Sequence, residues 1–161
     1  EYRGTAQAEV TESSLMDKEE VAEEVRKVIE DRGIPDTGVS VNDRGVTITL
    51  ENIQFLPNSS ILTATEKDKI RTIASILSKY PEKDLRITGH TAYAPGYTED
   101  EHMKLSVERA ESVANYLLEL GVRKSTQMIV EGKGHSEPLG DNETAQGMKK
   151  NRRVEITILE N

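Results

Sequence analysis

Cysteine and tryptophan are absent from the sequence, and phenylalanine occurs once in 161 residues. Without cysteine the chain can form no disulfide, thiol redox pair or thiolate metal site. Aromatic side chains make up only 4% of the residues, so the hydrophobic core must be built from Ile, Leu, Val and Ala. Single domains are commonest at roughly 100–150 residues, so this length suits one domain with an appendage.

Basic charge is also scarce, because 21 Lys and Arg against 29 Asp and Glu leave a net charge of −8. Nucleic acids and anionic membrane surfaces need a concentrated basic face, so both are disfavoured as partners. No apolar run approaches the roughly 20 residues that span a bilayer. We expect membrane attachment only through segments outside this sequence. Since the chain starts at Glu1 and not at Met, we interpret it as a mature or truncated product with upstream segments.

Catalytic signatures are missing as well. The Gly-Lys-Gly segment at 132–134 begins like a dinucleotide-binding loop, but Glu137 stands where the third glycine belongs. Ser106 has no recognisable His and Asp relay, and the carboxylates lack calcium-loop spacing. His90 lies on a predicted strand and is expected to be a buried structural histidine. The sequence therefore predicts a protein that is not an enzyme and that needs no metal or cofactor.

The apolar pattern divides the chain into three parts. Residues 1–14 lack periodicity and predict a linker, residues 15–38 predict a helical extension, and residues 39–161 predict a folded domain. Within the extension an acidic helix is expected from Leu15 to Arg32, ended by Gly33. Its single apolar stripe fits docking onto its own domain or pairing with a partner helix or a second copy.

The apolar pattern of residues 39–161 predicts strands and helices in alternation. A hairpin is expected across residues 39–50 with its turn at 42–45, where a glycine allows a tight reversal. The further elements are a helix capped by Thr65, a strand at 85–89, a helix capped by Ser106, strands at about 126–132 and 154–158, and loops at 51–64, 91–104 and 132–147. The order α-β-β-α-β-α-β-β predicts an α+β fold, a two-layer sandwich in which a mixed sheet carries two main helices on one face.

Several segments of residues 39–161 resemble the OmpA-like family, which includes peptidoglycan-associated lipoprotein and flagellar stator domains of bacteria. They occur in the order that the family has: Ile53-Gln54-Phe55, Tyr80-Pro81, the Ile-Thr-Gly-His-Thr of 87–91, the Leu-Ser-Val-Glu-Arg-Ala of 105–110, and the Asn-Arg-Arg-Val-Glu-Ile of 151–156. The resemblance implies the family's βαβαββ fold, here preceded by a helix and hairpin. It also implies a place in the cell envelope, in the periplasm and associated with the outer membrane.

The resemblance further implies recognition of the peptide stem of peptidoglycan, typically at diaminopimelate. That ligand presents a carboxylate and an ammonium, so its pocket needs one cation and one anion. The family's cation is matched here by Arg109, whereas Ala92 stands where the family has an Asp. A charge-assisted hydrogen bond contributes about 1.5–3 kcal/mol, so its loss would weaken binding roughly 10- to 150-fold.

The rest of the expected pocket follows from the same resemblance. His102 replaces an expected Asn in a loop that is longer than usual, and Met148 replaces a frequent Arg, so the pocket is divergent. The residues expected to bind the ligand are Thr91, Ala92, His102, Leu105, Arg109, Asn151 and Arg152. Alternatives stay open for three of them. For Thr91 the alternative is a hydroxyl bonded to backbone, for His102 a place at the surface or in the pocket wall, and for Arg152 a structural ion pair. Arg153 is expected at a solvated sheet edge.

The position of Arg109 in its helix also matters. If Ser106 caps that helix, Arg109 lies in the first turn, where a cation opposes the helix dipole and free N–H groups help to bind an anion. The alternative role of Arg109 is a structural ion pair with one of the acids at 99–101. For those acids themselves two further roles are open: one of them replaces the missing carboxylate in the pocket, or all of them stay in a solvated loop. Two functions are therefore open: a cell-wall anchor that binds the stem through Arg109, or a degenerate domain that serves as a structural or protein-interaction module in the envelope.

Overall fold

The computed structural model describes residues 17–56 and 59–160, so the predicted linker at 1–14 lies outside the described residues. The elements are α2 (Lys18–Arg32), β1 (Thr37–Asn42), β2 (Gly45–Glu51), α3 (Ala64–Leu77), β3 (Leu85–His90), α4 (Glu99–Glu119), the 3-10 turn η1 (Ser125–Gln127), β4 (Met128–Gly132), α5 (Ala145–Asn151) and β5 (Arg153–Leu159). Every helix and strand predicted within these residues is present, and α5 is an addition.

Five strands form one mixed sheet in the order β1-β2-β5-β3-β4. β3 and β4 run parallel, and the other neighbouring pairs are antiparallel. Side chains alternate between the two faces of a strand, so the apolar residues of each strand gather on one face. Ile156 of β5 lies opposite Ile48 of β2 and Ile87 of β3, and all three side chains are fully buried. The mixed sheet and the α+β class are therefore as predicted.

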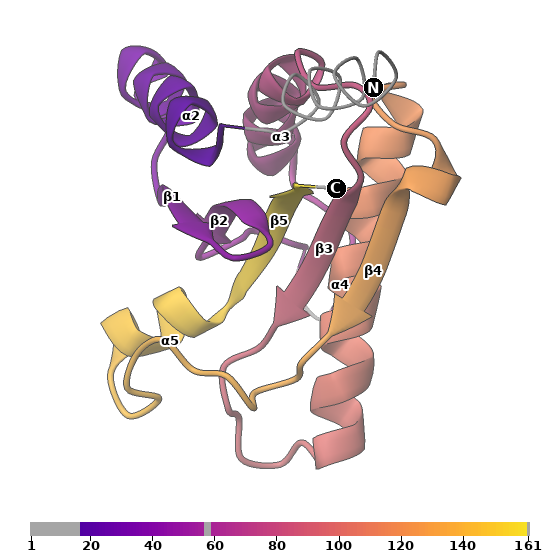
Figure 1. The fold of residues 1–161 in the computed structure, drawn as a ribbon. Coiled ribbons are helices and arrows are strands. Elements are labelled where there is room, and N and C mark those ends of the chain that lie inside the picture. The colour runs from indigo at the N-terminus through magenta and orange to yellow at the C-terminus, as the bar shows by residue number, and fades with distance from the viewer. Residues whose placement is uncertain (1–16, 57–58, 161) are drawn as a thin grey trace, which may run out of the picture.

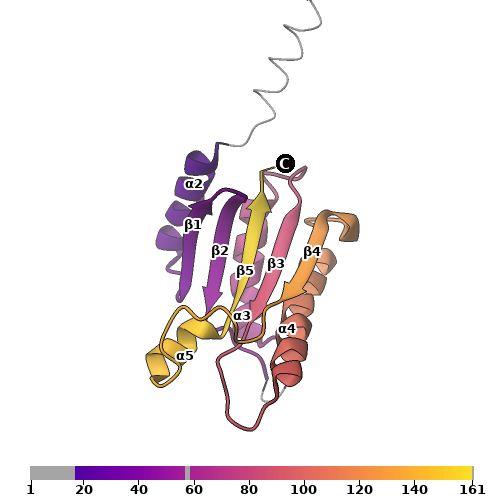
Figure 2. The same ribbon diagram turned by 60° about the horizontal axis from the view of Figure 1, so that its bottom comes forward.

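The helices α2, α3 and α4 lie on one face of this sheet, and the described residues place no helix over the opposite face (Figure 1 and Figure 2). α2 packs over β1 and β2 with Val21, Ala22 and Val25 buried, while α4 covers β3 and β4. The predicted two-layer sandwich is confirmed, and the apolar stripe of α2 docks onto its own chain. Within the described ranges no helix combines the length and the apolar character needed to cross a bilayer.

The start of α4 differs from the prediction. Thr98 is the N-cap, because its hydroxyl accepts a hydrogen bond from the Glu101 N–H at 3.1 Å while the Glu101 carboxylate accepts one from the Thr98 N–H at 2.8 Å. This reciprocal pair satisfies two free donors of the first turn. Ser106, the predicted cap, lies inside the helix, where its hydroxyl donates to the Met103 carbonyl and accepts from the Gly134 N–H. The prediction was wrong because Thr98 with Glu101 caps better than a buried serine.

Two other boundaries also differ. The N-cap of α3 is Thr63, whose hydroxyl accepts from the Glu66 N–H, and not the predicted Thr65. α5 occupies the end of the stretch 132–147 that was predicted to be a loop, and Thr144 caps it. This helix has seven residues and no apolar periodicity, so its sequence gave no signal for a helix.

The close approach of α4 to β3 depends on Gly89. A Cβ atom at this position would collide with the backbone carbonyl of Ser106 and crowd the Ala110 side chain. We expect Gly89→Ala to destabilise the domain by about 1–3 kcal/mol, because overpacking against backbone forces the helix away from the sheet. Urea denaturation followed by circular dichroism measures this. Gly38→Ala in β1 is the control, since nothing lies within 4 Å of its added Cβ; equal effects of both changes would contradict the explanation.

Candidate functional site

The residues predicted to bind a ligand come from three places in the fold. These are the segment after β3 with Thr91 and Ala92, one face of α4 with His102, Leu105 and Arg109, and the end of α5 with Asn151 and Arg152. Spacings of three and four residues put the three α4 side chains on a common side of the helix. The end of β3, the start of α4 and α5 all lie at the same end of the sheet (Figure 1).

Arg109 is a half-buried cation whose guanidinium lies over the ring of Phe55. Its guanidinium carbon lies 4.7 Å from the centre of the Phe55 ring, a favourable arrangement for a cation. Its Nη2 donates a long hydrogen bond of 3.5 Å to the Ser59 carbonyl. Its Nε is buried and has no hydrogen-bond partner among the described residues. Because Arg109 lies in the middle of α4, the expected contribution of the helix N-terminus to an anion site is excluded.

Arg152 is the second cation of this region. Its backbone carbonyl accepts a hydrogen bond of 3.2 Å from the Ile53 N–H, which places it beside the segment that ends in Phe55. Burial lowers the pKa of Arg109, the positive charge of Arg152 lowers that pKa further, and Tyr97 opposes both effects. We call Phe55, Tyr97, Arg109 and Arg152 the Arg109 site.

The acids at 99–101 do not neutralise this site. Glu99 contacts the Nε2 of His135 at 2.8 Å, and Glu101 takes part in the Thr98 cap. The ion pairs within the described residues include neither Arg109 nor Arg152. The structural ion pairs considered for both arginines are therefore not formed with any described carboxylate.

Thr91 and Ala92 are both buried at the end of β3, with 5% and 9% of their surfaces exposed. The Thr91 N–H donates to the Gly134 carbonyl at 2.8 Å, which fixes the backbone next to β4. The Thr91 hydroxyl, however, has no partner among the described residues. The alternative in which backbone satisfies the Thr91 hydroxyl is therefore not seen among the described residues. Leaving this buried polar group without a hydrogen bond costs stability.

His102 holds the loop between β3 and α4. Its Nε2 lies 3.0 Å from the Ala94 N–H, which can only donate, so this nitrogen accepts. Its Nδ1 then carries the proton and donates to the Thr98 carbonyl at 2.9 Å. Both contacts require the neutral ring, and only 2% of the residue is exposed. With both nitrogens engaged and the ring almost fully buried, His102 has no free nitrogen for a ligand, which fits the alternative role of pocket wall.

Aromatic rings surround His102. Tyr93 stacks on it with ring centres 5.7 Å apart, Tyr97 lies at 5.6 Å, and His135 meets it edge-on at 4.6 Å. Sequence reasoning missed this cluster, because His135 comes from the loop after β4 and nothing in its local sequence points to the 92–98 loop. The cluster packs Tyr93 and Tyr97 of the 92–98 loop against the start of α4.

Asn151 is a positioning residue. It is fully buried, and its Oδ1 accepts from the N–H groups of Leu139 and Gly140 at 2.7 and 2.8 Å. Its Nδ2 donates to the Gly140 carbonyl and to Asn142 Oδ1. Asn142 Oδ1 in turn accepts from the Tyr93 N–H at 3.2 Å. The amide of Asn151 is thus used to tie the 139–142 loop to the loop after β3.

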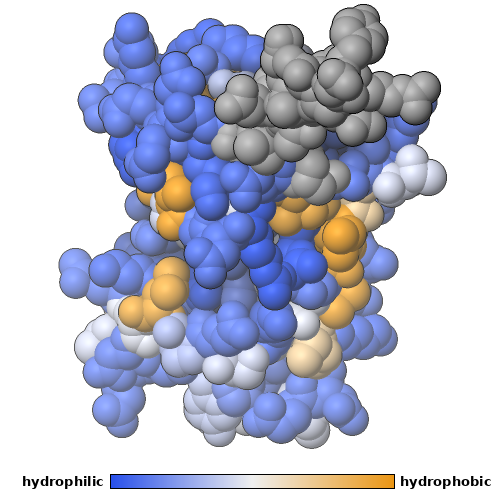
Figure 3. Space-filling view, viewed as in Figure 1, coloured by the Kyte–Doolittle hydropathy of each residue, from blue (hydrophilic) through white to orange (hydrophobic). Residues whose placement is uncertain are grey.

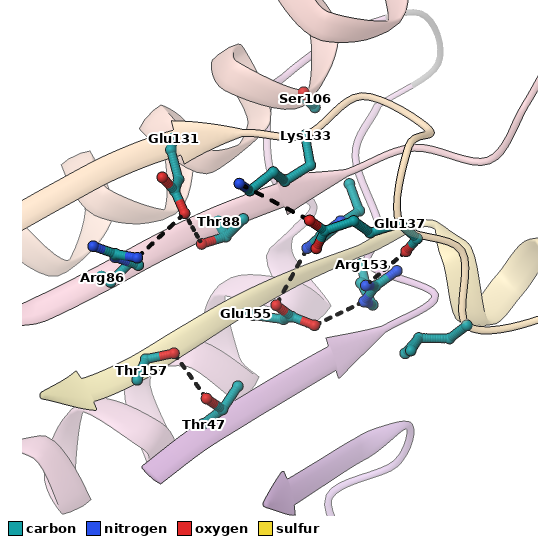
Figure 4. A network of polar contacts seen from close by, with 12 residues as sticks. Thr47, Arg86, Thr88, Ser106, Glu131, Lys133, Glu137, Arg153, Glu155 and Thr157 are labelled. Carbon is teal, nitrogen blue, oxygen red and sulfur yellow. Dashed lines mark hydrogen bonds and ion pairs between the residues drawn. The ribbon is translucent and has the colours of Figure 1, made fainter. Parts of the chain in front are cut away.

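The face of the sheet without helices carries a polar network (Figure 4). Arg153 Nε donates to one oxygen of Glu155 at 2.9 Å, and His90 Nε2 donates to the other at 3.2 Å. His90 is buried, as expected. The expectation of a solvated Arg153 was wrong, because β5 is a central strand and the Glu137 carbonyl of the covering loop accepts from its Nη2; only 2% of Arg153 is exposed.

Most of the surface seen in the direction of Figure 1 is hydrophilic, and hydrophobic residues appear there as separate patches (Figure 3). On this side the molecule therefore offers polar and charged groups to a ligand and no continuous apolar surface. The Arg109 site, with two cations, an unpartnered Nε and two aromatic rings, is consistent with binding of an acidic group.

The sequence matches the OmpA family over residues 54–152. That match covers more than half of the chain, and this protein belongs to the OmpA family. It is 37% identical over 125 residues to the probable lipoprotein YiaD of Escherichia coli (strain K12), an alignment that covers 76% of this chain and 56% of the relative. The chain thus spans little more than half the length of that relative.

Two solved structures support the assignment. The cell wall anchor of the T6SS from Pseudomonas aeruginosa is 26% identical, with a TM-score of 0.70, and the match covers 84% of this chain and 96% of that one. The periplasmic domain of Helicobacter pylori MotB is 25% identical, with a TM-score of 0.72 and coverage of 81% and 83%. The expected OmpA-like fold is therefore confirmed.

Proposed function

We propose that this domain binds the peptide stem of peptidoglycan, with Arg109 bonded to a stem carboxylate. The observation that carries the proposal is the state of Arg109 itself: the guanidinium is half-buried, its Nε is unpartnered, and it forms no ion pair with a described residue. Burying a cation without a counter-charge costs stability, which a ligand carboxylate would offset. The chain has a net charge of −8, yet neither Arg109 nor Arg152 forms an ion pair with a described carboxylate, which fits a site that receives an anionic ligand.

The relatives fit such a role. One is described as a cell wall anchor, one as a periplasmic domain and one as a probable lipoprotein. By analogy, this domain holds its parent protein to the wall in the periplasm, near the outer membrane, and acts without catalysis. The relevant chemistry is retention of a ligand by charge and hydrogen bonds, so no reaction has to be assigned to any residue.

The second candidate is a degenerate domain that serves as a structural or protein-interaction module. Ala92 favours this second candidate, because an alanine supplies no carboxylate where the family has an Asp. The other ligand-binding residues, Thr91 and Leu105 among them, would then be remnants of an earlier pocket.

A titration with soluble muropeptides, followed by calorimetry or NMR, separates the two candidates. We expect the wild type to bind and Arg109→Ala to bind about 10- to 150-fold more weakly, since the variant loses charge-assisted hydrogen bonds. The thermal midpoint of Arg109→Ala should stay level or rise, because the change removes a desolvated cation next to Arg152. Loss of binding without loss of stability identifies a ligand-binding residue.

Arg26→Ala is the matched control, because it removes the same charge from α2, where Arg26 forms a surface ion pair with Glu23. It should leave binding unchanged. If the wild type does not bind muropeptides and Ala92→Asp does, the domain has lost peptidoglycan binding, and the second candidate, a protein-interaction module, is supported. Equal losses in Arg26→Ala and Arg109→Ala would show that the interaction is nonspecific.

A further inference from the structure

His102 is bonded to the loop between β3 and α4 through contacts that only a neutral ring can make. Its Nε2 accepts a hydrogen bond of 3.0 Å from the Ala94 N–H, and its Nδ1 donates to the Thr98 carbonyl at 2.9 Å. A protonated imidazole carries a hydrogen on both nitrogens and has no acceptor left. Protonation of His102 would therefore set two donors, Nε2–H and the Ala94 N–H, against each other at hydrogen-bond distance.

The backbone of residues 92–97 is tied to the rest of the domain at two points among the described residues. One is the Ala94 bond to His102, and the other runs from the Tyr93 N–H to Asn142 Oδ1 at 3.2 Å. The rings of Tyr93 and Tyr97 lie against His102, yet 45% of each tyrosine is exposed. Solvent therefore reaches this loop as soon as the bond to His102 opens.

The rings around His102 do not compensate for a proton on it. Stacking on Tyr93 favours a positive ring, but it supplies no acceptor for a hydrogen on Nε2. His135 meets His102 edge-on, with ring centres 4.6 Å apart, and a charge on both rings would be repulsive. Only 2% of His102 is exposed, so water cannot solvate the charge while the loop stays in place.

The acids at the start of α4 are committed elsewhere. The Glu99 carboxylate lies 2.8 Å from His135 Nε2, and the Glu101 carboxylate accepts from the Thr98 N–H. The ion pairs within the described residues include none with His102. A charged His102 would thus be buried without a counter-charge, which strongly disfavours the closed loop.

We infer that His102 is a positioning residue whose neutral ring holds the 92–97 loop closed, and that its protonation in mild acid releases the loop. Because the closed loop requires the neutral ring, protons bind preferentially to the released state, which gains population as the pH falls. A histidine side chain in water takes up its proton between about pH 8 and pH 5. The buried His90 differs, because its Nε2 donates to Glu155 and this bond survives protonation.

The inference deepens the proposed function by naming a regulation of the same site, and its consequence for binding rests on that function. The loop carries Ala92 and Tyr93, and Ala92 is among the residues expected to bind the ligand. Release of the loop in acid would disorder this part of the pocket and weaken the binding of a stem peptide.

Two NMR measurements on the full wild-type chain test the inference without a ligand. Nitrogen-15 spectra of the imidazole rings at pH 7.5 should show His102 protonated on Nδ1 and unprotonated on Nε2, as its contacts require. The exchange protection factor of the Ala94 amide, corrected for the intrinsic effect of pH, should fall about 10-fold or more between pH 7.5 and pH 5. This range lies above the one in which Glu155 takes up its proton.

His102→Gln supplies the matched variant, because its amide oxygen can accept from the Ala94 N–H and does not titrate. Its Ala94 protection factor should be the same at both pH values. His135→Gln is the control, since it removes the neighbouring histidine and should keep the acid response. Muropeptide affinity should fall about 10-fold from pH 7.5 to pH 5 in the wild type and stay constant in His102→Gln.

Three results would overturn the inference: a proton on Nε2 of His102 at pH 7.5, an Ala94 protection factor that does not change with pH, or an acid response in His102→Gln equal to that of the wild type. If His102→Gln does not fold, the two wild-type measurements still decide. Absence of muropeptide binding at pH 7.5 would contradict the proposed function alone, because the ring and amide measurements need no ligand.

Discussion

Replacing Glu155 by alanine is expected to destabilise the domain by about 3–5 kcal/mol. The Glu155 carboxylate joins two buried groups on the face of the sheet without helices. Arg153 donates to one oxygen (Figure 4) and His90 to the other. Only 2% of Arg153 and 3% of His90 are exposed, so water cannot replace the lost acceptor. The Nη1 of Arg153 already has no described partner, so the variant would leave a buried cation with a single hydrogen bond, to the Glu137 carbonyl. Urea denaturation gives the free energy of unfolding directly.

Two further variants make this expectation specific. Glu131→Ala is the matched control on the same face, since Glu131 is partly exposed, its contact with Arg86 measures 3.8 Å, and it accepts one hydrogen bond of 3.2 Å, from Thr88. Its loss should cost less than about 1 kcal/mol. Adding Arg153→Met to Glu155→Ala should recover most of the stability, because it removes the stranded charge. If the double variant is as unstable as the single one, burial of Arg153 is not the cause.

The same carboxylate gives the domain a defined acid sensitivity. Burial raises the pKa of Glu155, but hydrogen bonds from His90 and Arg153, together with their charges, outweigh it and lower the pKa from 4.5 to about 2. A depressed pKa in the folded state stabilises the fold above the unfolded-state value and loses that contribution as protons bind. Stability should therefore fall between about pH 4.5 and pH 2. Glu155→Gln should be less stable at neutral pH and show a flatter profile over that range.

Asn151→Ala is the second change with a large expected effect, about 3–5 kcal/mol of stability. Asn151 is fully buried, and its removal leaves the N–H groups of Leu139 and Gly140 without an acceptor. It also frees Asn142, which positions the Tyr93 N–H in the loop after β3. Ligand binding should weaken along with stability, although the Asn151 amide itself is already occupied. Thermal unfolding and the muropeptide titration measure the two effects.

Asn142→Ala separates the two consequences of that change. It removes the two hydrogen bonds that Asn142 Oδ1 accepts, from the Tyr93 N–H and from Asn151 Nδ2, but leaves the bonds between Asn151 and the backbone of residues 139–140 in place. We expect a stability loss of about 1–2 kcal/mol, as for two half-buried hydrogen bonds that share one acceptor. If Asn142→Ala and Asn151→Ala cost the same, the backbone bonds of Asn151 are not what stabilises this loop.

The sequence by itself determined the class of fold and the family. Alternating apolar residues such as Ile48, Ile87 and Ile156 predict strands with one buried face, because a strand has a period of two whatever its neighbours are. The stripes of the two main helices follow in the same way from their period. Arg109 was a candidate from its motif alone. The boundary between an extension at 15–38 and a domain at 39–161 stays a prediction.

Only the tertiary structure decided which groups meet. α4 begins at Thr98 because a reciprocal cap forms there, and this moves Arg109 from the first turn to the middle of the helix. Arg153 is buried because β5 lies between β2 and β3, an order that local periodicity does not encode. Arg152 lies beside Ile53 because the Ile53 N–H donates to its backbone carbonyl, a contact between distant parts of the chain. Periodicity is a local property of the sequence, whereas burial, charge pairing and unsatisfied donors depend on contacts between segments far apart in it.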